Sequence, residues 1–173
     1  MTHPTGHTLG VAIVVASPAR EVLEEARSRY EPTSGEMPPH VTVLAPIDVD
    51  VDAMPAVVRH LQMVAATTRP FALSLQGTGT FRPISPVVFV VVSAGVDECA
   101  ALESRVRAGD MAVETRFPYH PHVTLAHDVS EDVLDRAAAD LADFGAQMQV
   151  RSMGLYERVD GRWDLVREFE FEG

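Results

Sequence analysis

The chain has 173 residues, of which 46% are hydrophobic and 23% are charged, and its formal net charge is −11. This length and composition are typical of a globular protein with one substantial core. The negative charge argues against an extended nucleic-acid surface, because such surfaces depend on clustered Lys and Arg. It leaves room for a small anion, since a local patch containing Arg82 or Arg116 would be enough to receive a terminal nucleotide.

The hydropathy pattern predicts neither a leader nor a membrane span. The first eight residues carry no basic region of the kind that opens a signal peptide. The most apolar stretch, residues 87–92, is far shorter than the roughly 20 residues that a spanning helix requires. The single cysteine, Cys99, cannot form an intramolecular disulfide, and we expect it to be a small core residue. We therefore expect a cytoplasmic protein without a membrane partner.

The first half of the chain alternates strand and helix patterns. Ser17-Pro18 fits a helix start, with Ser as the cap and Pro in the first turn. The glycine-rich segment 77–86, including Gly77-Thr78-Gly79-Thr80, predicts a tight turn, because it lacks the Gly-Lys-Ser/Thr ending of a phosphate-binding loop. In chain order, the predicted elements are a strand over 9–16, a helix over 17–30, a loop over 31–39, a strand from residue 40, a helix over 52–67, and strands over 71–76 and 87–93.

The second half repeats this order. Asp160-Gly161 is a strong hairpin signal between the last two strands. The predicted elements are a helix over 97–107, a loop to residue 121, a strand from residue 122, a helix over 130–144, and strands over 147–158 and 162–171. The repetition predicts a duplicated α+β unit in which residues 1–173 form a single bilobal domain with repeats of about 8–93 and 94–173.

The sequence Pro-His-Val-Thr occurs once in each half, at residues 39–42 and 121–124. Successive side chains of a strand point to opposite faces, so His and Thr would lie on one face and Val on the other. One such motif is a weak signal, because a lone histidine beside apolar residues is more often a hydrogen-bonded core group. Two copies about half the chain length apart predict one site built from both halves.

Two histidines suit the opening of a cyclic phosphodiester, because one can act as a neutral base while the other acts as a cationic acid. Their ordinary pKa near 6.5 permits both states near neutral pH, and each group contributes a factor of roughly 10² to 10⁴. We assign these roles to His40 and His122 without deciding which is the acid. Thr42 and Thr124 would donate hydrogen bonds to the phosphoryl oxygens. This chemistry requires no metal and no cofactor.

With these motifs, the chain resembles the two-histidine (2H) phosphoesterase superfamily, in particular its branch similar to 2′-5′ RNA ligase and 2′,3′-cyclic phosphodiesterase. The resemblance implies two antiparallel sheets that flank a central cleft, with helices on the outside. It implies a metal-independent hydrolase of 2′,3′-cyclic phosphates on a small nucleotide or an RNA terminus. Cleavage or ligation of 2′-5′ linkages, and a nucleotide-binding or RNA-end-binding protein without turnover, remain alternatives.

Two further interpretations concern the residues beside the motifs. Phe81, Arg82 and Tyr119 would offer aromatic surface and a cation for a base and a phosphate. A competing interpretation is a zinc site, because two histidines share a strand face near a third and an acid. Its ligands would come from His120, His122, His127 and Asp128.

Overall fold

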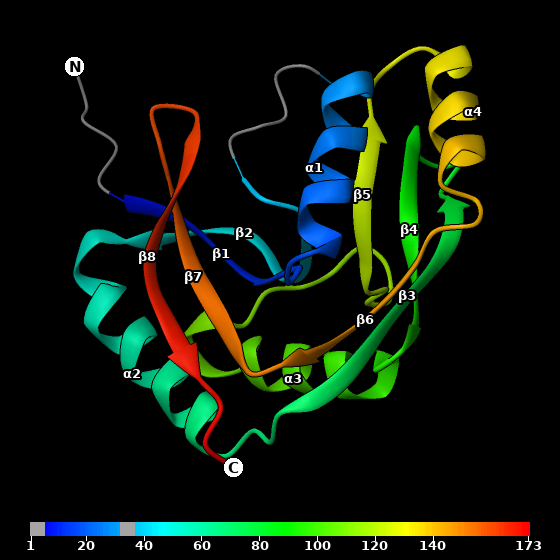
Figure 1. The fold of residues 1–173 in the computed structure, drawn as a ribbon. Coiled ribbons are helices and arrows are strands. Elements are labelled where there is room, and N and C mark those ends of the chain that lie inside the picture. The colour runs from blue at the N-terminus through cyan, green and yellow to red at the C-terminus, as the bar shows by residue number, and fades with distance from the viewer. Residues whose placement is uncertain (1–5, 32–36) are drawn as a thin grey trace, which may run out of the picture.

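The structure is a computed structural model that describes residues 6–31 and 37–173. Within these residues the chain forms eight strands, four α-helices and two single 3₁₀ turns, at Val51–Ala53 and Gly109–Met111 (Figure 1). In chain order the strands and α-helices are β1 (Gly6–Val14), α1 (Ala19–Tyr30), β2 (His40–Asp50), α2 (Met54–Ala66), β3 (Phe71–Thr80), β4 (Val87–Ala94), α3 (Val96–Val106), β5 (His122–His127), α4 (Glu131–Asp140), β6 (Gly145–Val150), β7 (Ser152–Val159) and β8 (Arg162–Glu170).

The strands pair antiparallel in the order β6-β3-β4-β5-β2-β1-β7-β8. The half β6-β3-β4-β5 carries the second motif, and the half β2-β1-β7-β8 carries the first. The two halves meet through β2 and β5, where Val41 pairs with Val123. The predicted α+β fold with antiparallel strands is thus confirmed, with the refinement that the two four-stranded halves join through their edge strands β2 and β5 into one eight-stranded sheet.

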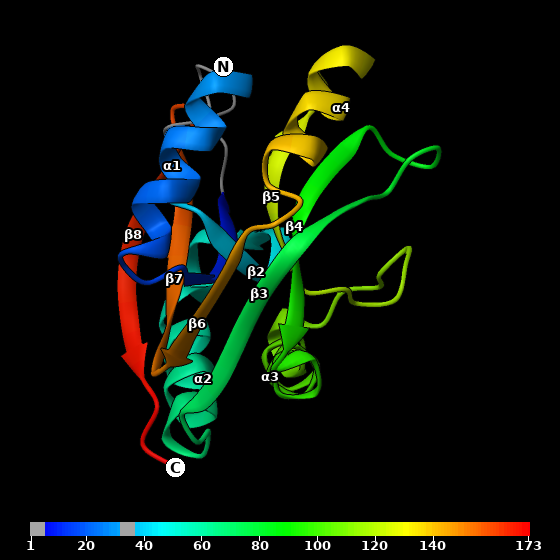
Figure 2. The ribbon, with the colours of Figure 1, turned by 45° about the vertical axis from the view of Figure 1, so that its right-hand side comes forward.

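Each half of the sheet is covered by two helices. Helix α4 packs on β3, β4 and β5, with α1 beside it on β5, whereas α3 contacts β2 and α2 contacts β8 (Figures 1 and 2). On the opposite side from α1, the β3–β4 connection and the segment between α3 and β5 both extend outward (Figure 2). None of the helices in the described ranges is long and apolar enough to cross a membrane.

The core lies on the face of the sheet that the helices cover. Residues 9–13 of β1 are all buried, which is expected of a strand that runs through the interior of the fold. Cys99 of α3 is fully buried, as predicted for a small core residue. At the start of β2 and of β5, by contrast, buried and half-buried residues alternate, which leaves one face of these strands available for functional side chains.

Strand β3 is longer than predicted, because residues 77–80 continue it instead of turning. Gly77 has a positive φ of 67° at an irregularity between Leu75 and Thr78, so the chain bends without leaving the sheet. A Cβ at Gly79 would lie 2.8 Å from two atoms of the Phe89 ring. Gly77 therefore permits the bend, and Gly79 permits the close contact with the Phe89 ring.

The segment predicted as one strand over 147–158 is two strands. Residue Arg151 separates β6, which pairs with β3, from β7, which pairs with β1 and β8. The chain thus passes from one half of the sheet to the other at this residue. Helix α4 ends at Asp140, four residues before its predicted end at residue 144. The predicted loop over 31–39 lies partly outside the described residues, at 32–36.

Candidate active site

The two motifs have the same alternation of burial. His40 and Thr42 are half-buried while Val41 is buried, and the first five residues of β5 repeat the pattern of β2 residue for residue. Each histidine is the first residue of its strand. The valines anchor both strands in the core, so the histidines and threonines are held on the opposite face, as the sequence predicts.

The strand register places the four motif residues side by side. Because β2 and β5 are antiparallel and Val41 is opposite Val123, His40 faces Thr124 and Thr42 faces His122 across the junction. Cross-strand neighbours lie on the same face of a sheet. The two halves are therefore related by a pseudo-twofold axis through the valine pair, and both histidines belong to one site.

Both imidazoles are tethered in the same way. Nδ1 of His40 donates a hydrogen bond to the carbonyl of Pro38 at 2.9 Å, and Nδ1 of His122 donates to the carbonyl of His120 at 2.7 Å. Since a carbonyl only accepts, the proton is on Nδ1 in each ring. Neither Nε2 atom has a hydrogen-bond partner among residues 6–31 and 37–173. Each ring thus presents Nε2 for proton transfer.

Burial lowers the pKa of both histidines. For His40, burial is the main cause and the bond to the Pro38 carbonyl opposes it, while nearby Arg27 and His122 lower the pKa further. For His122, burial is again the main cause, its own carbonyl partner opposes it, and His120 adds a smaller lowering. The neutral form of each ring is favoured in the free protein, and a bound phosphate anion would favour the protonated form of one of them.

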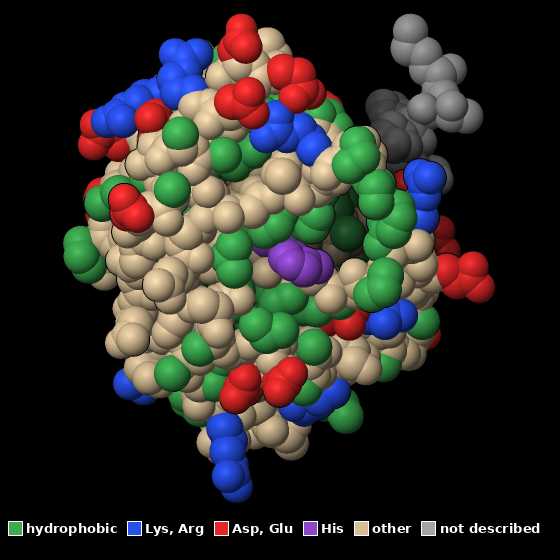
Figure 3. Space-filling model, turned by 90° about the vertical axis from the view of Figure 1, so that its right-hand side faces the viewer, with side chains coloured by type: hydrophobic (Ala, Val, Ile, Leu, Met, Phe, Trp, Pro, Cys, Tyr) green, Lys and Arg blue, Asp and Glu red, His purple; other side chains and the backbone are tan. Residues whose placement is uncertain are grey.

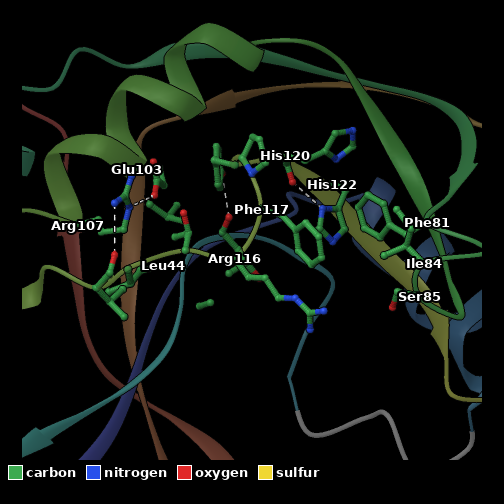
Figure 4. Close-up of a pocket in the computed structure, with 17 residues that line it drawn as sticks. Leu44, Phe81, Ile84, Ser85, Glu103, Arg107, Arg116, Phe117, His120 and His122 are labelled. Carbon is green, nitrogen blue, oxygen red and sulfur yellow. Dashed lines mark hydrogen bonds and ion pairs between the residues drawn. The ribbon is translucent and has the colours of Figure 1, made fainter.

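A cavity of about 500 Å³ opens beside His122 and Thr42. Its walls come from the start of β2, the β3–β4 connection, the end of α3 and the segment that precedes β5, so both halves of the chain contribute (Figure 4). Histidine side chains lie in a hollow surrounded by hydrophobic side chains on this face of the molecule (Figure 3). The apolar recess thus adjoins His122 and Thr42, whereas His40 and Thr124 are not among its lining residues.

Two phenylalanines fix the position of the His122 ring. Its centroid lies 5.0 Å from that of Phe81 in an edge-to-face arrangement and 5.2 Å from that of Phe89. The His120 ring contacts the same two phenylalanines, at 5.3 and 5.2 Å. Such aromatic contacts favour a defined ring orientation. Phe89 was not anticipated from sequence as a site residue, because it lies within an apolar run that only predicts a buried strand.

Of the three predicted substrate contacts, the structure places two at the cavity. Phe81 and Tyr119 line it, and the Tyr119 hydroxyl donates a 2.8 Å hydrogen bond to the carbonyl of Thr42. Arg82 is not among the lining residues, and its guanidinium pairs instead with Glu131 and Asp135 of α4, at 2.7 and 2.9 Å. These carboxylates explain the position of Arg82. The sequence around Arg82 does not predict the pairing, because the carboxylates lie about 50 residues later in the chain.

Arg116, and not Arg82, is an arginine at the cavity wall. Arg116 lines the cavity, and its guanidinium carbon lies 5.2 Å from the centre of the Phe117 ring, which is 54% exposed (Figure 4). Glu103 and Arg107 also line the cavity and were missed. A signal existed for Glu103, since it falls on the apolar stripe of α3 with an arginine four residues later.

The alternative zinc ligands do not converge. His120 and His122 precede or begin β5, whereas His127 ends it, and five residue steps of a strand span roughly 16 Å. The His127 ring lies 3.7 Å from Glu31 and 3.4 Å from Asp128 instead. In the described parts of the chain, no three His, Cys, Asp or Glu side chains are grouped so that they could hold a metal ion.

The 2′-5′ RNA ligase superfamily model matches residues 14–162. The chain belongs to this superfamily, the 2H phosphoesterases. It is 26% identical over 164 residues to a Bacillus cytotoxicus protein to which phosphoesterase activity is attributed, with 95% of this chain and 90% of that protein aligned. A Bacillus cereus relative with the same attribution is 27% identical, with 93% and 95% aligned.

Solved structures of this superfamily have the same fold. LigT of Escherichia coli complexed with 3′-AMP matches with a TM-score of 0.74 and 20% identity, over 97% of this chain and 99% of LigT. TT0787 of Thermus thermophilus matches with a TM-score of 0.72 and 22% identity, over 96% and 98% of the two chains. The family and its phosphoesterase relatives support hydrolase chemistry for this 2H protein.

Proposed function

We propose that this 2H protein hydrolyses 2′,3′-cyclic phosphates of nucleotides or RNA ends to phosphomonoesters, without a metal. The observation that carries the proposal is the matched pair of imidazoles, His40 and His122, each held through Nδ1 with Nε2 unpaired within the described residues. A base and an acid are the two groups that this hydrolysis requires. The pseudo-twofold arrangement supplies two equivalent groups for the two sides of one phosphate.

In the proposed reaction, the neutral imidazole removes a proton from water as the water oxygen bonds to phosphorus. The bond from phosphorus to one ribose oxygen breaks, and the protonated imidazole gives its proton to that oxygen. Attacking and leaving oxygens lie roughly in line in such transfers, so the base and the acid belong on opposite sides of phosphorus. The orientation of the substrate decides whether His40 or His122 is the base.

Thr42 and Thr124 would bind the phosphoryl oxygens that carry the negative charge. Within residues 6–31 and 37–173 neither hydroxyl has a hydrogen-bond partner, and each is opposite the histidine of the other motif. Donors placed before the reaction stabilise charge that develops in the transition state, and the loss of one typically costs about 10²- to 10³-fold. Arg116 at the cavity wall is a further cation for an anionic substrate.

The relatives support a nucleotide substrate. E. coli LigT has been crystallised with 3′-AMP, a nucleoside monophosphate of the type that such hydrolysis produces, and also with NADP⁺ and ATP. The cavity of about 500 Å³, with apolar walls next to His122, offers a suitable volume for a base and a ribose. The net charge of −11 is consistent with a short substrate, because it disfavours an extended nucleic-acid strand.

Hydrolysis of 2′,3′-cyclic nucleotides in the presence of a chelator tests the proposal. Phosphorus NMR identifies the product, and we expect a phosphomonoester whose rate of formation falls at least about 10²-fold in His40→Ala and in His122→Ala. His127→Ala is the matched control, because this histidine ends the same strand and its side chain is 55% exposed. Full activity in either motif variant, or activity that disappears with the chelator, contradicts the proposal.

The same measurements separate the alternatives. Turnover of 2′-5′-linked dinucleotides with no hydrolysis of cyclic phosphates would favour the ligase-like activity. Nucleotide binding by calorimetry with no product from any of these substrates would favour a binding protein.

A further inference from the structure

Glu103 is the one charged residue that is buried in the described ranges. It is only 5% exposed, and Thr68 is the other polar residue in this class. Charged side chains are rarely buried without a reason, because removing a carboxylate from water is costly. Glu103 nevertheless lines the same cavity as His122.

The carboxylate is held in place by its own helix. Glu103 belongs to α3, on the stripe that also contains Cys99, Leu102 and Val106, and its Oε1 accepts a 2.5 Å hydrogen bond from Nε of Arg107. Burial is the main cause that raises the pKa of Tyr119, and the negative charge of Glu103 adds to it. The carboxylate therefore lies near the Tyr119 wall of the cavity.

Among the described residues, the second oxygen of this carboxylate has no hydrogen-bond partner. Within the described residues Oε1 is bonded to Arg107, while no hydrogen bond is made to Oε2. No fully enclosed side-chain oxygen of the described residues lacks a partner. Oε2 is therefore not fully enclosed, and the side chain that carries it lines the cavity. An acceptor in that position, on a side chain that is more than nine-tenths buried, is a site for a hydrogen-bond donor of a ligand.

Glu103 and the histidines lie at different ends of the cavity. Figure 4 shows Glu103 and Arg107 on one side, His122 and Phe81 on the other, and Leu44, Arg116 and Phe117 between them. A nucleotide whose phosphate is at His122 would extend its base through the apolar middle section. The edge of that base would then face the carboxylate.

We propose that Glu103 selects guanine as the base of the nucleotide substrate. Guanine presents two adjacent donors, N1–H and the N2 amino group; one would bond to the open Oε2 and the other to the second lone pair of Oε1, which already accepts from Arg107. Neutral adenine and cytosine offer one amino donor next to an unprotonated ring nitrogen, and uracil places an acceptor on each side of its single N–H. A buried acceptor left facing another acceptor is strongly unfavourable, so uracil should be the poorest substrate.

This selectivity rests on the proposed function for the position of the phosphate. Its test compares kcat/KM for the four 2′,3′-cyclic nucleotides in the wild-type protein and in Glu103→Gln. We expect the guanosine substrate to exceed the uridine substrate by about 10- to 100-fold, and Glu103→Gln to remove most of this ratio. The matched control is Glu98→Gln, an exposed glutamate on the same helix, which should leave the ratio unchanged.

Calorimetry with the four nucleoside 3′-monophosphates measures base preference without turnover. Guanosine-selective binding that Glu103→Gln abolishes would support this inference even if no cyclic nucleotide is hydrolysed, in which case only the proposed function fails. Equal affinity for all four bases, or a guanosine preference that survives Glu103→Gln, overturns the inference. If Glu103→Gln does not fold, Glu103→Asp takes its place, because it keeps the charge but withdraws it by one methylene. A guanosine preference that is unchanged in Glu103→Asp also overturns the inference.

Discussion

The hydrogen bond from Tyr119 to the backbone of Thr42 provides a sharp test of how the site is built. It joins the segment before the second motif to the strand of the first motif, with a distance of 2.8 Å between the hydroxyl and the carbonyl oxygen. Tyr119→Phe removes the hydroxyl and keeps the ring. The carbonyl of Thr42 then loses its side-chain partner, and leaving a buried polar group without its hydrogen bond costs about 1–3 kcal/mol.

This cost should appear in both stability and activity. For a chain of this size, a loss of 1 kcal/mol lowers the melting temperature by about 2–4 °C, so we expect Tyr119→Phe to lower it by about 2–12 °C. Thr42 is opposite His122, and a displacement of its strand would misplace the hydroxyl that we propose as a phosphate ligand. We expect kcat/KM for a cyclic nucleotide to fall about tenfold or more, since small displacements of positioning groups are costly.

Tyr30→Phe is the matched control. The Tyr30 hydroxyl donates a 2.7 Å hydrogen bond to Asp140, which links α1 to α4 away from the cavity. Its removal should lower the melting temperature by a similar amount and leave kcat/KM unchanged. Differential scanning calorimetry and steady-state kinetics on both variants measure the two effects. If Tyr119→Phe loses stability but keeps full activity, the bond only holds the fold together and our reasoning about Thr42 is wrong.

Three further predictions concern the histidines and their surroundings. Burial lowers the pKa of both His40 and His122, and the reaction needs one ring neutral and one protonated. We therefore expect kcat/KM to peak below about pH 6.5 and to fall about tenfold per pH unit above the peak. A maximum above pH 7 would contradict this expectation. Gly79→Ala should lower the free energy of unfolding by about 1–3 kcal/mol, as measured by denaturant titration, because its methyl group would meet the Phe89 ring at 2.8 Å. Arg82→Ala should change KM by less than about twofold, because the Arg82 guanidinium is paired with carboxylates of α4. A larger rise in KM would show that Arg82 contacts the substrate.

The sequence predicted the motif strands well because each motif carries its own evidence. Alternation of His-Val-Thr fixes which side chains share a face, and the buried valines confirm it. The order of strands was harder to predict, since the change of partner at Arg151 depends on long-range pairing and leaves no turn residue in the sequence. Periodicity alone therefore merged β6 and β7 into one strand.

Contacts between distant segments also explain the differences at the site. Arg82 was expected at the substrate as a cation in a loop beside the motifs, but carboxylates about 50 residues later in the chain hold it elsewhere. Glu103 was not singled out because a glutamate in a helix is usually exposed, although its place among the buried residues of α3 was a signal. Local pattern predicts which residue types could act, whereas packing decides which of them reach the cavity.

The central claim is that His40 and His122 act together on one phosphate. The most direct test is a double-mutant cycle on kcat/KM for a 2′,3′-cyclic nucleotide with His40→Ala, His122→Ala and the combined variant, each checked for a native circular dichroism spectrum. We predict that each single change costs about 10²- to 10⁴-fold and that the double variant is little worse than the poorer single one, because groups that act as a unit are strongly non-additive. Losses that multiply, or a single variant with wild-type activity, would contradict a shared site.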